Sequence, residues 1–280
     1  MLDGMAFGWL TVFLDFPPDA FGAEVAFWRK VTGCSLSPPR GAAGEFATLL
    51  PPSGDAYLRV QRVLGGGGGC HLDLHVDTAS EPLAEAADRA VALGARVRRR
   101  DGDARGDRLI IADSPGGFTF CLVEWHGESV APAPLAIDGA GSSRVDTLCL
   151  DVPPAVFERE CSFWAELTGW EPRDAAVPGF RDLRRPAGMP ARLLFQRLDS
   201  AAPGQRVRSH LDFGCTDPAR EVSRHVGLGA RVADTFPHWT VLTDPAGREY
   251  CLVTRDPDTV RSTASRVRRP IWLSCGLSAE

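Results

Sequence analysis

The sequence has little lysine, no long apolar run and no excess of positive charge. Lys30 is the only lysine among 31 basic residues, and 36 acidic residues give a formal net charge of −5. Nothing therefore favours the phosphate contacts that dominate nucleic-acid affinity. No stretch reaches the roughly 18 consecutive apolar residues of a membrane-spanning helix. We expect neither a nucleic-acid partner nor a membrane partner.

Paired cysteines are also missing. The eight cysteines include no Cys-x-x-Cys pair, so their spacing predicts neither a zinc ribbon nor a disulfide framework. The apolar segment 5–14 follows Asp3 instead of a basic stretch and has no small-x-small cleavage site, unlike a secretory signal peptide. These absences favour reduced thiols and a cytoplasmic protein.

The sequence does contain an internal repeat. Segment 14–33 (LDFPPDAFGAEVAFWRKVTG) returns as segment 150–169 (LDVPPAVFERECSFWAELTG). Four shorter motifs recur in the same order: Gln-Arg from 61 and 196, His-Leu-Asp from 71 and 210, Gly-Ala-Arg-Val from 94 and 229, and Cys-Leu-Val from 121 and 251. Two copies of one domain explain this order.

The composition between the copies marks their boundary. Segment 126–143 is rich in Pro, Ala, Gly and Ser and has no apolar period, which is typical of a linker. We therefore predict a first domain at 1–130, a linker at 131–142, a second domain at 143–256 and a C-terminal extension at 257–280. The extension is either solvated or docks its apolar segment 271–273 onto a partner.

Each copy contains one order of elements twice. In the first copy an apolar, β-rich run at 10–16 precedes a helix in which Phe21, Val25 and Trp28 recur at helical spacing, and three short strands follow. From residue 70 the order restarts with a strand, a helix at 81–93 and three more strands. The second copy repeats this with helices at 155–168 and 218–228. The sequence thus predicts an α+β chain of four βαβββ units.

Paired units with an H-L-D strand, a helix followed by G-A-R-V and a closing D-P-x-G turn resemble the vicinal oxygen chelate superfamily. That superfamily includes glyoxalase I, bleomycin-resistance proteins and extradiol dioxygenases. The match is best to its glyoxalase-like domains, through F-Q-R at 195–197 and E-Y-C-L-V at 249–253. The resemblance implies two tandem glyoxalase-like domains, each a curved mixed sheet around a cup with helices outside.

Metal-dependent members of that superfamily line the cup with His, Glu, His and Glu. The matching positions here carry mostly other residue types, in order Trp9, Gln61, His71 and Cys121 in the first copy and Val145, Gln196, His210 and Cys251 in the second. Tryptophan and valine do not ligate metals, so the resemblance implies a degraded site and no cofactor. The alternative is a divalent metal ion, with His71, Gln61, His210 and Gln196 as its candidate ligands.

The H-L-D strands carry alternating polar residues. His71, Asp73 and His75 share one face, as do His210 and Asp212, because side chains alternate along a strand. His71 and His75 lie about 13 Å apart along the strand, too far to bind one ion together. A structural or ligand-contacting role and a metal contact both stay open for these histidines. Trp9 either stacks on a flat ligand in the cup or fills the core.

These observations lead to two functional hypotheses, so whether the protein is an enzyme stays open. The first is a protein that binds a small apolar or aromatic metabolite or antibiotic in a cup. The second is a divalent-metal-dependent lyase, isomerase or dioxygenase. Trp9 and the polar strand favour the cup of the first copy, and a homodimer is an option. The predicted ligand-contacting residues are Trp9, Gln61, His71, Asp73, His75, Cys121, Gln196, His210, Asp212 and Cys251.

Overall fold

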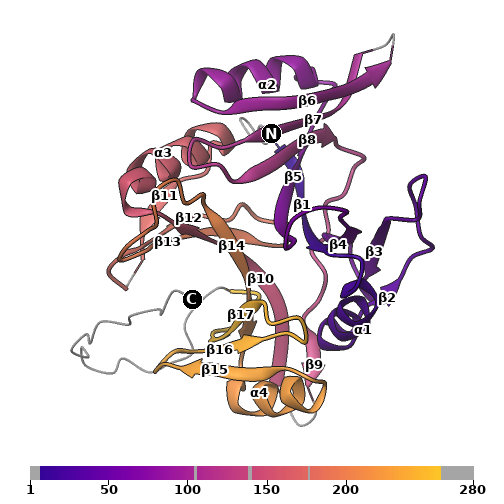
Figure 1. Ribbon diagram of the computed structural model, residues 1–280, viewed down its shortest axis with the longest axis vertical. Coiled ribbons are helices and arrows are strands. Elements are labelled where there is room, and N and C mark those ends of the chain that lie inside the picture. Colours follow the sequence, from indigo (N-terminus) through magenta and orange to yellow (C-terminus); the bar gives the residue numbers. More distant parts are fainter. Residues whose placement is uncertain (1–6, 104–105, 138–140, 176, 260–280) are drawn as a thin grey trace.

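The computed structural model shows two mixed sheets that pack against each other, with four α-helices around them (Figure 1). It describes residues 7–103, 106–137, 141–175 and 177–259, so the predicted role of segment 271–273 lies outside the described residues. The predicted α+β class and the two glyoxalase-like copies are confirmed. No helix in these ranges is long and apolar enough to span a membrane.

The first sheet holds eight strands in the order β2-β3-β4-β1-β5-β8-β7-β6. In chain order its strands are β1 (Phe7–Phe16), β2 (Ser35–Leu36), β3 (Phe46–Leu50), β4 (Leu58–Arg62), β5 (Gly69–Val76), β6 (Arg96–Asp103), β7 (Gly106–Asp113) and β8 (Thr119–Glu124). Its helices are α1 (Phe21–Thr32) and α2 (Leu83–Ala92). Strand β1 pairs in parallel with β4 and antiparallel with β5, which joins the two units of this copy into one sheet.

The second sheet repeats this order as β11-β12-β13-β10-β14-β17-β16-β15, with β9 beside β10. Its strands are β9 (Leu135–Ile137), β10 (Gly141–Val152), β11 (Pro172–Asp174), β12 (Phe180–Leu183), β13 (Arg192–Arg197), β14 (Arg208–Cys215), β15 (Arg231–Thr235), β16 (Trp239–Thr243) and β17 (Glu249–Thr254). A 3-10 turn η1 (Pro154–Val156) leads into α3 (Phe157–Thr168), and α4 is Pro218–Gly227. Strand β9 shows that the predicted linker 131–142 contributes to the second sheet.

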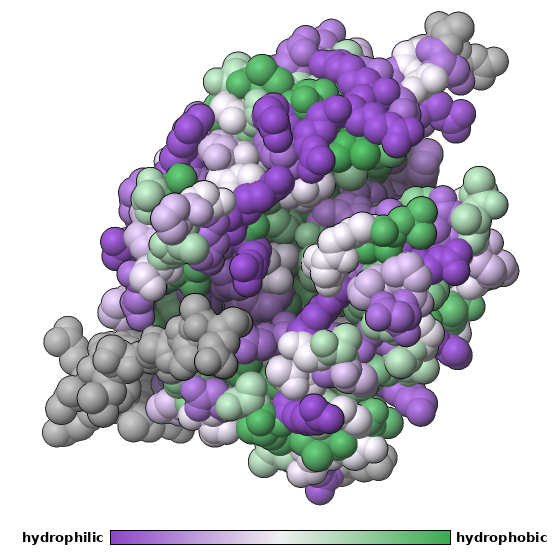
Figure 2. Space-filling view, viewed as in Figure 1, coloured by the Kyte–Doolittle hydropathy of each residue, from purple (hydrophilic) through white to green (hydrophobic). Residues whose placement is uncertain are grey.

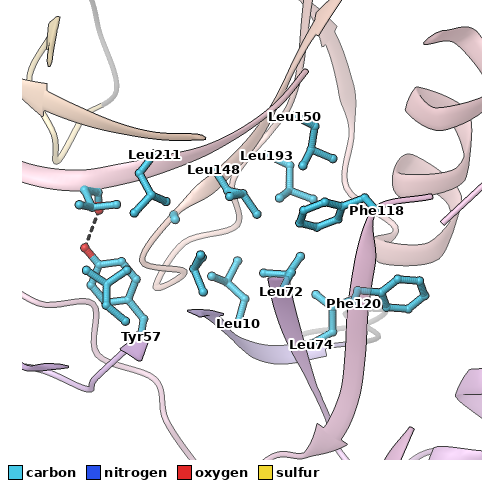
Figure 3. Close-up of a cluster of buried hydrophobic side chains, with 14 of the residues drawn as sticks. Leu10, Tyr57, Leu72, Leu74, Phe118, Phe120, Leu148, Leu150, Leu193 and Leu211 are labelled. Atoms are coloured by element: carbon cyan, nitrogen blue, oxygen red, sulfur yellow. Dashed lines mark hydrogen bonds between the residues drawn. The ribbon is translucent and has the colours of Figure 1, made fainter. Parts of the chain in front are cut away.

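The central strands of both sheets share one apolar core. Figure 3 shows Leu10, Leu72 and Leu74 of the first sheet facing leucines of the second sheet, at positions 148, 150, 193 and 211. Tyr57 also joins the copies, because its hydroxyl donates a hydrogen bond to the Val145 carbonyl at 2.5 Å. The other face of each sheet is thereby left for a cup.

The first helix of each copy packs against the sheet of the other copy. On α1, the Trp28 ring stacks on Phe213 with centroids 6.2 Å apart. On α3, the Trp164 ring meets Phe118 and Phe120 edge-on at 6.1 and 5.3 Å. Each copy therefore needs the other to bury its own helix.

A buried glutamate reinforces each of these helix contacts. Glu24 on α1 accepts a hydrogen bond from the Ala246 backbone N–H at 2.7 Å, and Glu160 on α3 accepts one from the Gly116 N–H at 2.7 Å. Both N–H groups belong to the turn before the last strand of the opposite copy. The repeat thus builds the same glutamate-to-turn contact twice, across the boundary between the copies.

Glu24 makes stability depend on pH. Burial, followed by a hydrogen bond to Asp244 and its negative charge, raises the pKa of Glu24 from 4.5 to about 8. Between these values only the unfolded chain loses the proton, so stability falls as pH rises, by up to about 1.4 kcal/mol per pH unit. Glutamine cannot ionise, so urea unfolding should show Glu24→Gln gaining on the native protein from about pH 5 to about pH 8. The exposed Glu85→Gln is the control, and a pH-independent difference would contradict the argument.

The outer edge of the first sheet is charged and internally paired. Strand β6 exposes a run of arginines, and the part of the surface where β6 and α2 lie is mostly hydrophilic in Figure 2. Arg96 and Arg98 contact Asp113, and Arg100 contacts Asp88 and Asp107. Charged edges discourage pairing with strands of other chains. This arginine run is accordingly a paired edge and offers no anion-binding site.

Candidate functional site

Each sheet carries a matching row of polar side chains on its cup face. The first-cup row is Asp15, His71, Asp73 and Cys121, and the second-cup row is Asp151, His210, Asp212 and Cys251. The register places Asp73 beside Cys121 and Asp212 beside Cys251 on adjacent parallel strands. Residues directly opposite on neighbouring strands share a face. Both copies therefore hold the same four residue types at equivalent places.

The histidine in each row lies between two carboxylates. The His71 Nδ1–H donates to Asp15 Oδ2 at 2.7 Å, and its Nε2 lies 3.7 Å from Asp73 Oδ1. In the second row the His210 Nδ1–H donates to Asp151 at 3.1 Å, and its Nε2 lies 3.4 Å from Asp212 Oδ1. The bond to Nδ1 fixes the ring so that Nε2 faces the second aspartate.

These carboxylates change the protonation of the histidines. Burial by itself lowers the pKa of His71, but the hydrogen bond to Asp15, its charge and that of Asp73 together raise it. Burial likewise opposes protonation of His210, whereas neighbouring Cys149 and Asp151 bring its pKa well above the usual value. Both rings are consequently held as imidazolium ions by their aspartates in the absence of a bound ion.

The cysteines of the rows are buried neutral thiols. Burial raises the pKa of the Cys121 thiol and, more modestly, that of Cys251. A nucleophilic cysteine needs a stabilised thiolate. Nucleophilic catalysis by these residues therefore finds no support in the geometry, although either sulfur remains a donor for a metal ion.

Beyond its row, the first cup is filled by its own side chains. His75 Nε2 lies 2.9 Å from Thr11 Oγ1, and burial lowers the pKa of His75 to about 4, so the ring is neutral. Trp9 is opposite His75 but only 1% exposed, and its indole N–H donates to the Ala56 carbonyl at 3.3 Å. Of the two roles that the sequence left open for Trp9, core filling is the one that matches this position. The ring offers no accessible face to a ligand.

Phe13 distinguishes the first cup from the second. Its ring stacks on the His71 imidazole, with centroids 4.5 Å apart and planes at 12°, and the Arg59 guanidinium lies over its other side at 5.6 Å. The equivalent residue opposite His210 is Cys149. The second copy therefore has a small side chain where the first places an aromatic ring over the histidine.

Three half-buried aromatic residues border the second cup, and sequence reasoning missed their role. Phe236 stacks on Trp239 at 4.7 Å and 21°, and Phe180 meets Trp239 edge-on at 6.4 Å. Phe180 is opposite Gln196, which in turn is opposite Asp151. Strands β12 and β16 belong to opposite wings of the sheet, so this contact joins the two walls of the cup. The alternation of Trp239 with Val241 was the signal for a shared face.

The glutamines and the first ligand position behave differently from each other. Gln61 and Gln196 lie next to the rows, opposite Asp15 and Asp151. Val145, in contrast, is buried in the shared core opposite Phe213. The structure thus brings the glutamines to the rows, whereas Val145 is directed to the core.

A buried ion pair lies in the second cup near the place where the first has His75. Asp146 accepts hydrogen bonds from Arg255, one of them from Nε at 2.8 Å. A Cβ added to Gly214 would lie 2.5 Å from Asp146 Oδ2, so glycine is needed there. The charged Asp146 within an otherwise apolar strand was the available sequence signal for this pair.

A cavity of about 480 Å³ lies outside the cups, between the copies. It is bordered by segment 130–134, Arg144 and Arg185. The Arg144 guanidinium donates to the Pro132 and Pro257 carbonyls. These bonds tie chain segments together, and the chemistry of the rows is not part of this cavity.

Comparisons with known proteins agree with this architecture. The fold is that of the vicinal oxygen chelate superfamily. The model of the glyoxalase-like domain matches residues 11–123 and 147–253. The chain therefore belongs to the glyoxalase-like domain family and contains this domain twice. No curated protein matches it by sequence.

Solved structures with the same fold are distant in sequence. The Mn(II)-bound glyoxalase from Novosphingobium aromaticivorans has a TM-score of 0.61 at 17% identity, over 92% of this chain and 86% of that one. The 2,2',3-trihydroxybiphenyl 1,2-dioxygenase from Sphingomonas wittichii strain RW1 has 0.56 at 17%, over 92% and 94%. A xylose isomerase-like TIM barrel/4-hydroxyphenylpyruvate dioxygenase fusion protein has 0.56 at 18%, over 89% of this chain but 49% of its own. These likenesses establish the fold alone.

The rows fit a metal ion, although not with the full set of the metal-dependent relatives. The donor atoms of His71, Asp73 and Cys121 lie within 4.8 Å of one another, as do those of the matching second trio. Oδ1 of Asp73 and of Asp212 is buried without a hydrogen-bond partner. Imidazole, carboxylate and thiolate together form a donor set that suits zinc.

Proposed function

We propose that this protein binds a small, flat aromatic molecule in its second cup, without the His-Glu-His-Glu metal set of metal-dependent relatives. The observation that carries this proposal is the place of Phe13 in the first cup, where a ring covers the histidine. Cys149 leaves the corresponding place over His210 without an aromatic side chain. A ligand ring fits the same stacking geometry there.

The surroundings of His210 support the second cup over the first, which the sequence had favoured. Phe180, Phe236 and Trp239 border it with half-buried aromatic surface. Aromatic side chains gain from stacked or edge-on contacts with another ring. Binding sites typically combine such walls with a few polar groups that orient the ligand. Asp151 and His210 supply those polar groups.

The test fills the proposed ligand position with the protein's own side chain. Cys149→Phe should reproduce the first cup and weaken binding of 2-naphthol at least about ten-fold, since a ring contact and its burial are lost. Trp239→Ala should also weaken binding, by about five-fold or more. Ligand-observed NMR titration of the full chain measures both effects.

Equivalent changes in the first cup provide the matched control. Leu109 has the strand position of Trp239, since Leu109 is opposite Val123 and Trp239 is opposite Val253. Leu109→Ala should leave the affinity for 2-naphthol unchanged. Equal losses in Leu109→Ala and Trp239→Ala would assign binding to neither cup in particular, and no saturable binding of flat aromatic probes would refute the proposal.

A divalent-metal-dependent lyase, isomerase or dioxygenase is the second candidate. It is favoured by one observation, the compact grouping of His, Asp and Cys donors in both rows. A metal bound there would act as a Lewis acid on substrate oxygens. His210 and Asp212 would hold the ion, while Asp151 would orient the imidazole.

A further inference from the structure

We infer that both rows are sites for a zinc-type divalent ion, each held by histidine Nε2, aspartate Oδ1 and cysteine Sγ. The ligands are His71, Asp73 and Cys121 in the first cup and His210, Asp212 and Cys251 in the second. This inference does not rest on the proposed aromatic ligand, because it concerns the rows themselves. It also replaces the expected four-ligand set by three residues from two adjacent strands.

The distances within the rows match a tetrahedral ion. With zinc bonds of 2.0–2.3 Å, neighbouring ligand atoms are separated by about 3.3–3.6 Å. The Nε2–Oδ1 distances are 3.7 Å in the first row and 3.4 Å in the second. Both are too long for a hydrogen bond. The spacing therefore suits an ion between these atoms better than direct contact.

The unpartnered aspartate oxygens independently indicate a missing cation. Asp73 is 5% and Asp212 3% exposed, and Oδ1 of each is buried without a hydrogen-bond partner. Buried polar atoms without partners are rare and costly. The same atom is unpartnered in both copies, although their surroundings differ at Phe13 and Cys149. A ligand common to both rows explains this coincidence.

Asp15 and Asp151 have the position of outer carboxylates in a metal site. Each accepts the Nδ1–H of its histidine and thereby leaves Nε2 for an ion. Carboxylate–histidine–metal arrangements of this kind orient the ring and strengthen it as a ligand. The same hydrogen bond thus stabilises an imidazolium without metal and a neutral, correctly directed imidazole with it.

The thiol decides which ions fit. Sulfur donors favour zinc and its spectroscopic substitute cobalt over manganese or magnesium, which prefer oxygen. The thiol and the histidine must release protons when the ion binds. We therefore expect stronger binding at alkaline pH and a preference for zinc over the manganese that the Novosphingobium glyoxalase binds.

Metal titration of the full chain tests the two sites directly. After treatment with chelator at pH 8, the chain should take up two equivalents of Zn²⁺. Co²⁺ should bind with the intense near-ultraviolet absorption of sulfur-to-cobalt charge transfer. Cys121→Ser and Cys251→Ser should each remove about half of this absorption, whereas Cys34→Ser, outside the rows, should retain all of it.

Asp15→Asn and Asp151→Asn protect the test against a folding defect of the cysteine variants. Each keeps the three ligands and should weaken zinc binding at its own site by about ten-fold or more. Uptake of fewer than two equivalents by the native chain would overturn the inference of matched sites. Charge-transfer absorption that survives in the Cys121→Ser, Cys251→Ser double variant would exclude these sulfurs as ligands. Loss of 2-naphthol binding with intact zinc uptake would refute only the proposed function.

Discussion

Trp164→Ala should lower the free energy of unfolding by about 3–5 kcal/mol, the range for removing a large buried aromatic side chain. Trp164 is fully buried, and its ring contacts Phe118, Phe120 and Phe163. Its indole N–H also donates to Glu160 Oε1 at 2.8 Å. The substitution leaves a cavity and takes a partner from a buried carboxyl group, so both losses act together.

The location of this loss makes the prediction more specific than a core defect. Trp164 belongs to the second copy, but Phe118 and Phe120 belong to the first. Urea unfolding followed by fluorescence and circular dichroism should therefore show one transition that shifts as a whole. Trp28→Ala should have an effect of similar size, and the half-buried Trp125→Ala a smaller one. A two-step transition that spares one copy would contradict the shared core.

Asp146→Asn is the second large prediction, with an expected loss of about 3–5 kcal/mol, because removing one partner of a buried ion pair leaves the other charge uncompensated. Asp146 and Arg255 are both buried. Although burial favours the neutral acid, the charge of Arg255 and its hydrogen bonds lower the pKa of Asp146. Asparagine has the shape of aspartate but no charge, so Arg255 would remain buried without a counter-ion.

Two comparison variants separate charge compensation from packing at this pair. Asp146→Leu with Arg255→Met should recover a substantial part of the lost stability, since a well-packed apolar pair avoids the desolvation of both charges. On the surface, Arg99 and Asp101 form an exposed pair, and Asp101→Asn should change stability by less than about 1 kcal/mol. A double variant as unstable as Asp146→Asn would argue against an uncompensated charge as the cause.

The repeated motifs by themselves determined the two copies, the four βαβββ units and the polar rows. Helical and strand periodicities and turn residues act over a few positions, so they can be read locally. The alternation of His71 with Asp73, and of His210 with Asp212, fixed a common face before any contact was known. The equivalent positions of Cys121 and Cys251 followed from the same repeat.

Only the tertiary structure decided which side chains surround those rows. Phe13 and Cys149 differ in the ring they place over the histidine, and Phe180 meets Trp239 from a distant strand. Local irregularities also matter, because one extra residue in a strand changes which side chains share a face. The register of the first sheet shifts between Phe7 and Trp9, and that of the second between Val145 and Thr147.

The exchange of helices between the copies was likewise beyond the repeat. Two identical patterns predict a helix over its own sheet as readily as over its partner's, since each apolar face suits either. The contacts that choose are long-range, such as the hydrogen bond from Trp28 to Asp244 across 216 positions of the chain. Sequence periodicity thus specifies the elements, whereas complementary packing between distant elements specifies their partners.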